Sequence, residues 1–281
     1  MKIDPKWLDV DFGMEAERIA EKRNRNPDVE GDDWEGEMLL GCSPTPQLSV
    51  DPEAGIKLMP KQEIIPVSEW RNLADMQKGR TLDYLIWLIK DQWREGSCTS
   101  NAATQGYQTL LRAALGVCIE FSAMSLYKRV GSGPNSGSGL GENVTELRDR
   151  GVLPTDNAEN KELFSITFPN VGWSNRLPSD WEDLAINFCI IEFEKITTEE
   201  EFGSAIWRGR PVLYGRDGHA ILGTRMVYND GQWRVKYANS WTPDWGDNGF
   251  GYDTLSRRLL GYGCYAFRSI KIPEHKYVLA A

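Results

Sequence analysis

The sequence predicts an α+β fold with two lobes, a helical lobe followed by an antiparallel β lobe, and a site in the cleft between them. Two observations carry this prediction. Apolar residues recur at helical spacing in the first half, most regularly over residues 98–115, whereas strand and hairpin signals dominate after residue 188. We expect the helical lobe at about residues 90–165 and the β lobe at about residues 170–281.

Composition narrows the classes of function. The chain has 281 residues, 41% of them hydrophobic, and 11 tryptophans, which is enough for one large core. Its net charge of −9 and its lack of a long basic run predict no nucleic-acid partner. The first residues lack the apolar core of a signal peptide, and no apolar run has membrane-spanning length. We therefore expect a soluble, cytoplasmic protein that does not bind a membrane.

The five cysteines are scattered and form no C-x-x-C pair, which argues against zinc and for reduced thiols. Cys118, Cys189 and Cys264 lie in apolar runs and are expected to be inert core thiols. Only two histidines are present, and His275 lies in a polar tail that we expect to be solvated. A mechanism that needs an imidazole therefore points to His219.

Residues 1–55 differ from the rest of the chain, with a charged helical pattern at 15–25 and an acidic stretch at 28–37. This composition predicts an N-terminal arm or propeptide-like extension. A single domain, large enough to hold a catalytic site, is expected to follow at 56–281. The arm either packs on the body or binds a partner protein. Residues 64–71 are expected to form the extended lead-in to the domain.

The most regular element is the helix expected from Cys98 to Leu115, with Ser97 as its N-cap and Gly116 just after its end. Unpaired backbone N–H groups and the helix dipole in the first turn favour negative charge, so we expect a lowered pKa for Cys98. The alternative interpretation is a small apolar residue that opens a core helix.

Next come a helix through Lys128, a glycine-rich loop at 131–141 and a short helix at 142–150. The loop is either a mobile linker or an edge that another backbone approaches closely. The second half predicts a strand at 188–193, a helix at 198–207 and a strand at 211–214.

Two strands flank the turn at 229–231, and His219 and Asn239 stand at the outer ends of these strands. Because the strands have similar lengths, the hairpin is expected to bring the two side chains together. With Cys98, they supply a thiol nucleophile, a base and a residue that orients the base.

Around these residues the sequence resembles the papain-like cysteine proteases. Residues 89–98 read I-K-D-Q-W-R-E-G-S-C against the family's V-K-[DN]-Q-x-x-x-G-S-C, and residues 218–223 read G-H-A-I-L-G, like the family's histidine strand. Residues 239–250 read N-S-W-T-P-D-W-G-D-N-G-F against N-S-W-G-x-x-W-G-x-N-G-[YF]. The similarity covers roughly residues 60–270 and is close only around these motifs.

The resemblance implies a papain-like fold and a cysteine peptidase acting on a peptide or protein substrate, without cofactor or metal. Cys98 would be the nucleophile, His219 the base and then the acid, and Asn239 the residue that holds the imidazole. The amide of Gln92 and the backbone N–H of Cys98 would form the oxyanion hole.

Three further positions follow from the same resemblance. Trp241 would shield the hydrogen bond between histidine and asparagine. Ser138 and Gly139 resemble the glycine-rich edge that pairs with the backbone of the substrate.

The chain also departs from the family. Thr99 replaces the tryptophan after the nucleophile, and Glu95 occupies the position of a cysteine, so that disulfide cannot form. Residues 1–55 are too short for the usual inhibitory propeptide, so activation by cleavage is not implied. Two alternatives stay open: a weak or inactive papain-fold assembly protein, and a triad enzyme that acts on another amide as an isopeptidase or transferase.

Overall fold

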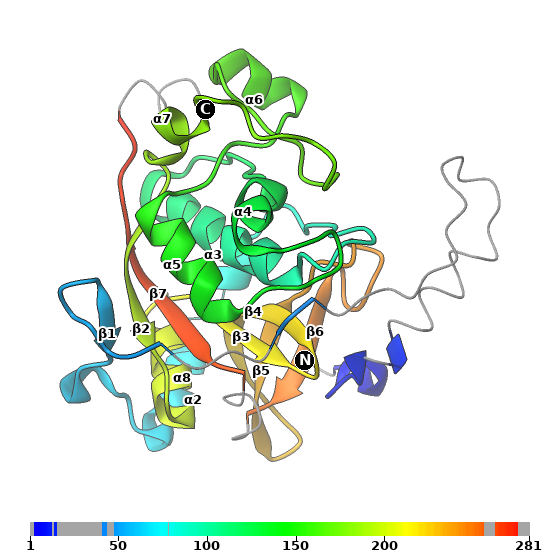
Figure 1. Cartoon of the computed structure of the whole chain (residues 1–281). Helices are drawn as coiled ribbons and strands as arrows, with labels where there is room; N and C mark the ends of the chain where they lie inside the picture. Colours follow the sequence, from blue (N-terminus) through cyan, green and yellow to red (C-terminus); the bar gives the residue numbers. More distant parts are fainter. Residues whose placement is uncertain are drawn as a thin grey trace.

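The computed structural model shows a mixed α+β fold in which a group of helices lies against one seven-stranded sheet (Figure 1). The α+β prediction is confirmed. The structure describes residues 3–12, 14–15, 41–43, 48–77, 79–255 and 262–274. The predicted helix at 15–25 and His275 lie outside the described residues. Within these ranges, no helix is long and apolar enough to cross a membrane.

The α-helices are α2 (Trp70–Met76), α3 (Cys98–Leu115), α4 (Ala123–Val130), α5 (Leu140–Asp149), α6 (Ala158–Leu163), α7 (Trp181–Ala185) and α8 (Glu199–Trp207). The helices predicted at 98–115, through Lys128, at 142–150 and at 198–207 form, with ends shifted by at most a few residues, and three short helices that the sequence did not predict, α2, α6 and α7, accompany them. The extended lead-in predicted at 64–71 is wrong over its second half, because a 3₁₀ turn at Val67–Glu69 continues directly into α2. Trp70 is buried and anchors that helix.

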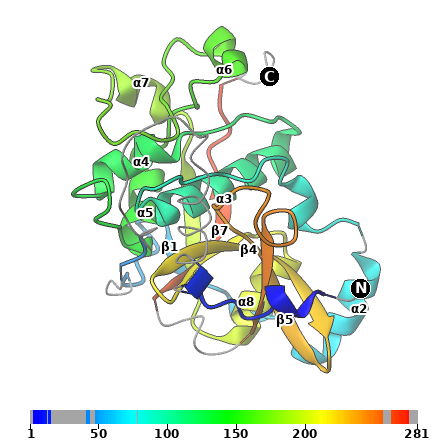
Figure 2. The same ribbon diagram turned by 90° about the vertical axis from the view of Figure 1, so that its right-hand side faces the viewer.

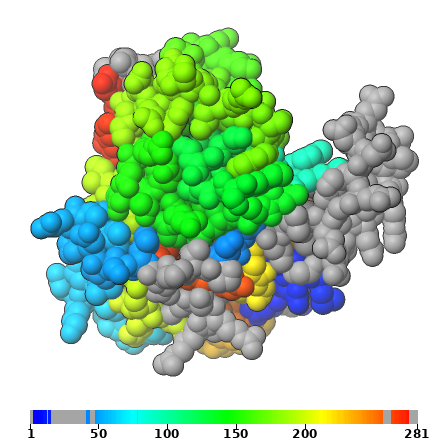
Figure 3. All heavy atoms as spheres, in the orientation of Figure 1, coloured from blue at the N-terminus to red at the C-terminus, as the bar shows by residue number. Residues whose placement is uncertain are grey.

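The sheet combines strands from distant parts of the chain, in the order β1-β2-β7-β3-β4-β5-β6. Its strands are β1 (Ile56–Leu58), β2 (Ile190–Lys195), β3 (Val212–Arg216), β4 (His219–Asn229), β5 (Gln232–Ala238), β6 (Phe250–Thr254) and β7 (Cys264–Ile270). Among the described strands, β1 and β2 pair in parallel and the other neighbours pair antiparallel. In the space-filling view, the green surface that includes α5 borders the blue surface that includes β1 (Figure 3).

The hairpin between β4 and β5 turns at Asp230 and Gly231, which both have positive φ (49° and 83°). Two consecutive positive φ angles are typical of the tight turn that suits the twist of a hairpin. The predicted hairpin is confirmed, and its strands carry His219 at one end and lead directly to Asn239 at the other.

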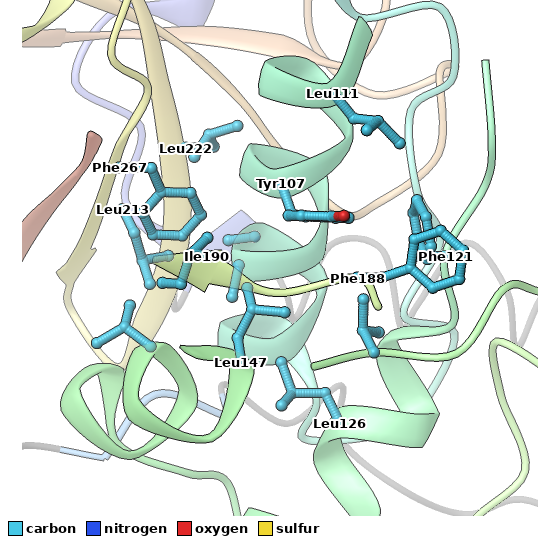
Figure 4. Packing of buried hydrophobic residues seen from close by; sticks show 14 of the residues in the cluster. Tyr107, Leu111, Phe121, Leu126, Leu147, Phe188, Ile190, Leu213, Leu222 and Phe267 are labelled. Carbon is cyan, nitrogen blue, oxygen red and sulfur yellow. The ribbon is translucent and has the colours of Figure 1, made fainter. Parts of the chain in front are cut away.

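Helix α3 is the centre of the larger core cluster, in which Tyr107 and Leu111 pack among side chains from the sheet and from neighbouring segments (Figure 4). A Cβ atom on Gly106 would lie 2.5 Å from the ring of Phe267, so the helix approaches the sheet closely at this point. Gly116 ends α3 with a φ of 75°, as predicted.

The apolar spacing over residues 98–115 indicates one buried face, but burial on α3 extends well beyond it. Polar residues such as Asn101 and Gln105 are also buried, whereas Ala114 is exposed. The helix is enclosed on nearly all sides over its first three turns. Hydrogen-bond partners for the side-chain amides of Asn101 and Gln105 must therefore come from inside the protein.

A second core cluster includes residues of α8 and of β3, β4, β5 and β7, and it contains Val10 and Phe12 from the N-terminal segment. Residues 3–12 run beside β6, where the backbone N–H of Asp9 donates to the carbonyl of Tyr252 at 2.8 Å (Figure 2). The boundary at residue 55 stays a prediction, but the described part of the arm is packed against the body.

Candidate active site

His219 and Asn239 meet at the ends of β4 and β5. The Nε2 atom of His219 lies 2.7 Å from the Oδ1 atom of Asn239, and both residues are buried. The same Oδ1 accepts the backbone N–H of Ser240 at 2.8 Å, which fixes the orientation of the amide. The hairpin therefore brings the predicted base and its orienting residue together, as expected.

Aromatic rings enclose the imidazole on two sides. Trp241 stacks on His219 with ring centroids 4.5 Å apart and planes 29° apart. Phe12, from the arm, meets the imidazole edge-on at 4.8 Å. This enclosure excludes water, and burial lowers the pKa of His219 to about 4 although the hydrogen bond with Asn239 acts in the opposite direction.

The second ring nitrogen of His219, Nδ1, is buried and has no hydrogen-bond partner among the described residues. A ring held through Nε2 keeps Nδ1 as the nitrogen that can exchange a proton with another group. The next residue along β4, Ala220, interacts through its backbone with the thiol of Cys98. The nucleophile candidate therefore lies beside the strand that carries the histidine.

Cys98 occupies the first turn of α3 and is fully buried. Burial raises the pKa of its thiol, and hydrogen bonds with the backbone of Ala220 and Gly41 oppose this effect without overcoming it. The predicted lowered pKa is therefore wrong for this closed arrangement, because the sequence does not show that the arm covers the helix N-terminus. Ser97 is the N-cap by position, but its hydroxyl accepts the amide of Asn101 and no backbone N–H.

Gln92 joins the cysteine motif to the asparagine motif. Its backbone N–H donates to the carbonyl of Ser240 at 2.9 Å, and the hydroxyl of Ser240 donates to Oε1 of Gln92 at 2.6 Å. The Nε2 atom of Gln92 donates to the carbonyl of Glu95 at 3.0 Å. Gln92 thus lies among the site residues with its amide fixed, and its part in an oxyanion hole stays a prediction.

The predicted substrate edge is occupied by residues 41–43 of the arm. The backbone N–H of Ser138 donates to the carbonyl of Gly41 at 2.9 Å, and the N–H of Ser43 donates to the carbonyl of Ser138 at 3.2 Å. Between them, the N–H of Cys42 donates at 2.8 Å to the carbonyl of Gly218, the residue before His219. This segment covers Cys98.

Gly139 has another role in this structure. Its N–H donates to the side chain of Glu142 at 3.0 Å, and its carbonyl accepts the side chain of Asn143 at 2.8 Å, because it is the N-cap of α5. Of the two predicted edge residues, Ser138 presents its backbone to an extended chain, and Gly139 does not.

Glycines allow this close approach. A Cβ atom on Gly41 would lie 2.0 Å from the carbonyl oxygen of Gly96, and one on Gly137 would lie 2.6 Å from the carbonyl oxygen of Gly41. The glycine-rich loop is therefore an edge that another backbone approaches closely. The sequence signal was present in the loop, but nothing in the pattern identified residues 41–43 as the approaching segment.

Behind Asn239, a small enclosed space of about 10 Å³ is lined by residues that include Asn101, Gln105 and Asn239. Asn101 Oδ1, Gln105 Nε2 and Asn239 Nδ2 are buried and have no hydrogen-bond partner among the described residues. The sequence does not single out the amides of Asn101 and Gln105, because these residues lie between the apolar residues whose spacing predicts the helix.

The remaining thiols differ from the expectation at one position. Cys189 and Cys264 are buried, as predicted, but Cys118 is exposed, because it lies in the short extended segment after α3. No group of metal-ligating side chains suited to a metal ion is found within the described ranges.

Comparison with known proteins shows the fold. No family model matches the chain, and no curated protein does. Among solved structures, xylellain, a cysteine protease from Xylella fastidiosa, is 18% identical, with a TM-score of 0.55 over 82% of this chain and 96% of that one. Procathepsin B S9 from Trypanosoma congolense is 12% identical, with a TM-score of 0.55 over 83% and 87% of the two chains.

Digestive procathepsin L 3 from the larval midgut of Tenebrio molitor is 15% identical, with a TM-score of 0.54. The match covers 64% of this chain and 66% of that chain, so this chain spans slightly less than two thirds of that relative. The similarity at this level of identity establishes a papain-like fold.

Proposed function

We propose that this chain, whose fold is papain-like, is a cysteine peptidase that hydrolyses peptide bonds through a thioester on Cys98. One observation carries the proposal: the imidazole of His219 is held through Nε2 by Asn239 at 2.7 Å and is stacked by Trp241. This arrangement leaves Nδ1 as the proton-exchanging atom on the strand that borders the cysteine.

The reaction is acyl transfer. Nδ1 of His219 takes the proton of Cys98, and the thiolate attacks the carbonyl carbon of the scissile bond. The histidine then gives the proton to the leaving amine, and a thioester remains on Cys98. Water, deprotonated by the same imidazole, hydrolyses the thioester and regenerates the thiol. The Gln92 amide and the Cys98 N–H stabilise the oxyanion in both steps.

The contacts of residues 41–43 support a peptide substrate. Ser138 binds this segment through both its N–H and its carbonyl, and the carbonyl of Gly218 accepts a third backbone hydrogen bond. Backbone pairing of this kind recognises an extended chain with little dependence on its side chains. The cleft is therefore suited to extended polypeptide, in this structure its own.

The structure corresponds to a closed form. Cys98 and His219 are each fully buried, under residues 41–43 and under Phe12 respectively. A substrate reaches them only after these arm residues leave. Displacement of the arm is thus the first step of the proposed reaction.

A papain-fold binding or assembly protein is the second candidate. The burial of Cys98 and His219 favours it, since a scaffold has no need of an accessible thiol. An isopeptidase or transferase would keep the same triad and act on a different amide bond.

A thiol-directed peptidyl vinyl sulfone separates the enzyme from the scaffold. We expect one label per chain, at Cys98, and faster labelling in the Phe12→Ala variant, in which the cover over His219 is reduced. Cys98→Ala should abolish the label and His219→Ala should slow it, whereas Cys118→Ala should change neither. Cleavage sites in a peptide library, identified by mass spectrometry, test the peptidase reaction itself. Labelling at the exposed Cys118 alone, together with an uncleaved library, would establish the scaffold.

A further inference from the structure

Two thiols meet at one hydroxyl group in the closed cleft. The Sγ atom of Cys98 lies 4.0 Å from Oγ1 of Thr99. The thiol of Cys42, in the arm, also interacts with the side chain of Thr99, and the two cysteines interact electrostatically with each other. Thr99 stands where the resembling proteases carry a tryptophan, so the smaller side chain leaves space for the Cys42 thiol.

The backbone on either side fixes this pairing. Oγ1 of Thr99 donates to the carbonyl of Ser138 at 3.1 Å, and the same carbonyl accepts the N–H of Ser43 at 3.2 Å. The backbone of Gly41 interacts directly with the thiol of Cys98. The residues on both sides of Cys42 are therefore anchored at the nucleophile and at the substrate edge.

The side chain of Cys42 has little freedom to turn away. Cys42 is buried with 5% of its surface exposed, and a Cβ atom on Gly215 would lie only 2.8 Å from its Sγ atom. Its N–H is held by the carbonyl of Gly218. In the closed form, the Cys42 thiol is therefore confined within reach of the electrostatic influence of Cys98.

We propose that Cys42 is an oxidation site that forms a disulfide with Cys98 and so locks the arm in the cleft. The proposal deepens the proposed function, because it gives that site a redox control. In its oxidised form the nucleophile is consumed and the substrate edge is covered by a covalently attached segment.

The oxidant is a low-molecular-weight disulfide, RSSR. With the arm displaced, the Cys98 thiolate attacks one sulfur, so that a Cys98–SR bond forms and RS⁻ leaves. As the arm returns, and before it is buried in the cleft, the Cys42 thiol loses its proton to water, and the thiolate attacks the Cys98 sulfur and releases the second RS⁻. The two protons of the thiols end on the two RSH molecules. Overall, two protein thiols are oxidised to one disulfide while RSSR is reduced to two RSH.

The order of these steps follows from the burial of both thiols. In the closed form, burial raises the pKa of Cys98 and of Cys42, so neither is readily a thiolate there. Displacing the arm exposes Cys98 at the N-terminus of α3 beside His219, where the thiolate is favoured. Cys98 is therefore the first to react, and Cys42 resolves the mixed disulfide.

The test uses the reduced full-length chain treated with oxidised glutathione, followed by alkylation of the remaining thiols and peptide mapping without reduction. We expect a cross-linked pair of peptides containing Cys42 and Cys98, with a loss of ~2 Da relative to the two thiols. Vinyl sulfone labelling of Cys98 should be lost and then restored by dithiothreitol.

Two variants provide the controls. Cys42→Ser should stop at the mixed disulfide of Cys98 with glutathione, whereas Cys118→Ser should still form the cross-link. Glutathione bound at Cys98 in the wild type, without the cross-linked peptides, would overturn the proposal.

The readout also separates the two proposals, because peptide mapping does not depend on catalysis. A cross-link in a chain that cleaves no peptide when reduced would support the disulfide between Cys42 and Cys98 and refute the peptidase function. Peptide cleavage by a chain that never forms the cross-link would do the reverse.

Discussion

Gln92 and Ser240 fix each other across two motifs that lie 148 residues apart in the sequence. The serine hydroxyl donates to Oε1 of the glutamine, and Nε2 of the glutamine faces the carbonyl of Glu95. The amide cannot rotate without losing both interactions. Its orientation is therefore set before any substrate enters, which is the condition for a donor that acts on a developing charge.

Replacing Gln92 with alanine should lower kcat by roughly 10²-fold and leave KM near the wild-type value, as loss of one oxyanion donor does. Steady-state kinetics on a peptide cleaved by the wild type would measure both constants, and thermal melting would check the fold.

Ser240→Ala is the matched variant, because it keeps the amide and removes only the hydroxyl that orients it. We expect a smaller loss of kcat from this variant. A rise in KM alone for Gln92→Ala would mean that the side chain binds substrate and does not stabilise the oxyanion.

At this scale, the sequence predicted which residues meet but not their protonation. The contact between His219 and Asn239 follows from their positions on the two strands of one hairpin, which is local information. The pKa of His219 and of Cys98 depends on Phe12 and Gly41, which come from the other end of the chain. No motif records which distant segment will exclude water from a site.

At the scale of elements, Phe12 is the link between the arm and the site. Its ring is fully buried against His219 and Trp241, and the guanidinium of Arg216 lies 4.6 Å from its centroid. Arg216 also donates to the carbonyl of Val10, which ties the same segment to β3. Removing this one ring should therefore affect the arm and the imidazole together.

Phe12→Ala should reduce the free energy of unfolding by about 3–5 kcal/mol, the usual cost of deleting a buried phenylalanine ring. It should also raise the pKa of His219 towards its ordinary value and speed the alkylation of Cys98 by iodoacetamide, because water then reaches both groups. Chemical denaturation and the pH dependence of alkylation would measure these effects.

Trp7→Ala is the control from the same arm. Trp7 packs on Trp245 with ring centroids 5.6 Å apart, whereas the rings that contact His219 within the described residues are those of Phe12 and Trp241. This variant should lower stability without changing the alkylation profile. Equal acceleration in both variants would mean that general loosening, and not the cover over His219, controls the thiol.

The elements show where local patterns suffice. The helix from Cys98 to Leu115 was predicted with both ends, because its period and its glycine stop are local. The segment at 67–76 was missed because the packing of its Trp70 against Trp233, which comes from later in the chain, decides its conformation.

At the scale of the whole molecule, the predicted division into a helical half and a β half is right in outline. Segments from before the helical half also pair with strands of the β half. β1 precedes all the long helices yet pairs with β2 in the sheet, and residues 8–9 run beside β6. Such pairings join segments more than 100 residues apart, so no short-range pattern indicates them.

The burial of His219 should make the stability of the whole molecule depend on pH. Its pKa is about 4 in the folded protein and near 6.5 when unfolded, so between these values the unfolded chain binds more protons. The contribution is fully present above pH ~6.5 and is lost as the pH falls towards ~4, by on the order of 3 kcal/mol. Asp253 acts in the opposite sense over a similar range, since burial raises its pKa to about 7.

The prediction is therefore tested by the difference in melting temperature between two proteins at each pH, because the pH dependence of one protein alone contains both titrations. His219→Gln removes the histidine titration and leaves Asp253 in place. Melting temperatures of the wild type and of this variant, measured from pH 4 to pH 7, should converge as the pH falls, because only the wild type loses the histidine contribution. Parallel curves would mean that His219 is open to water in solution and that the arm does not stay closed over it.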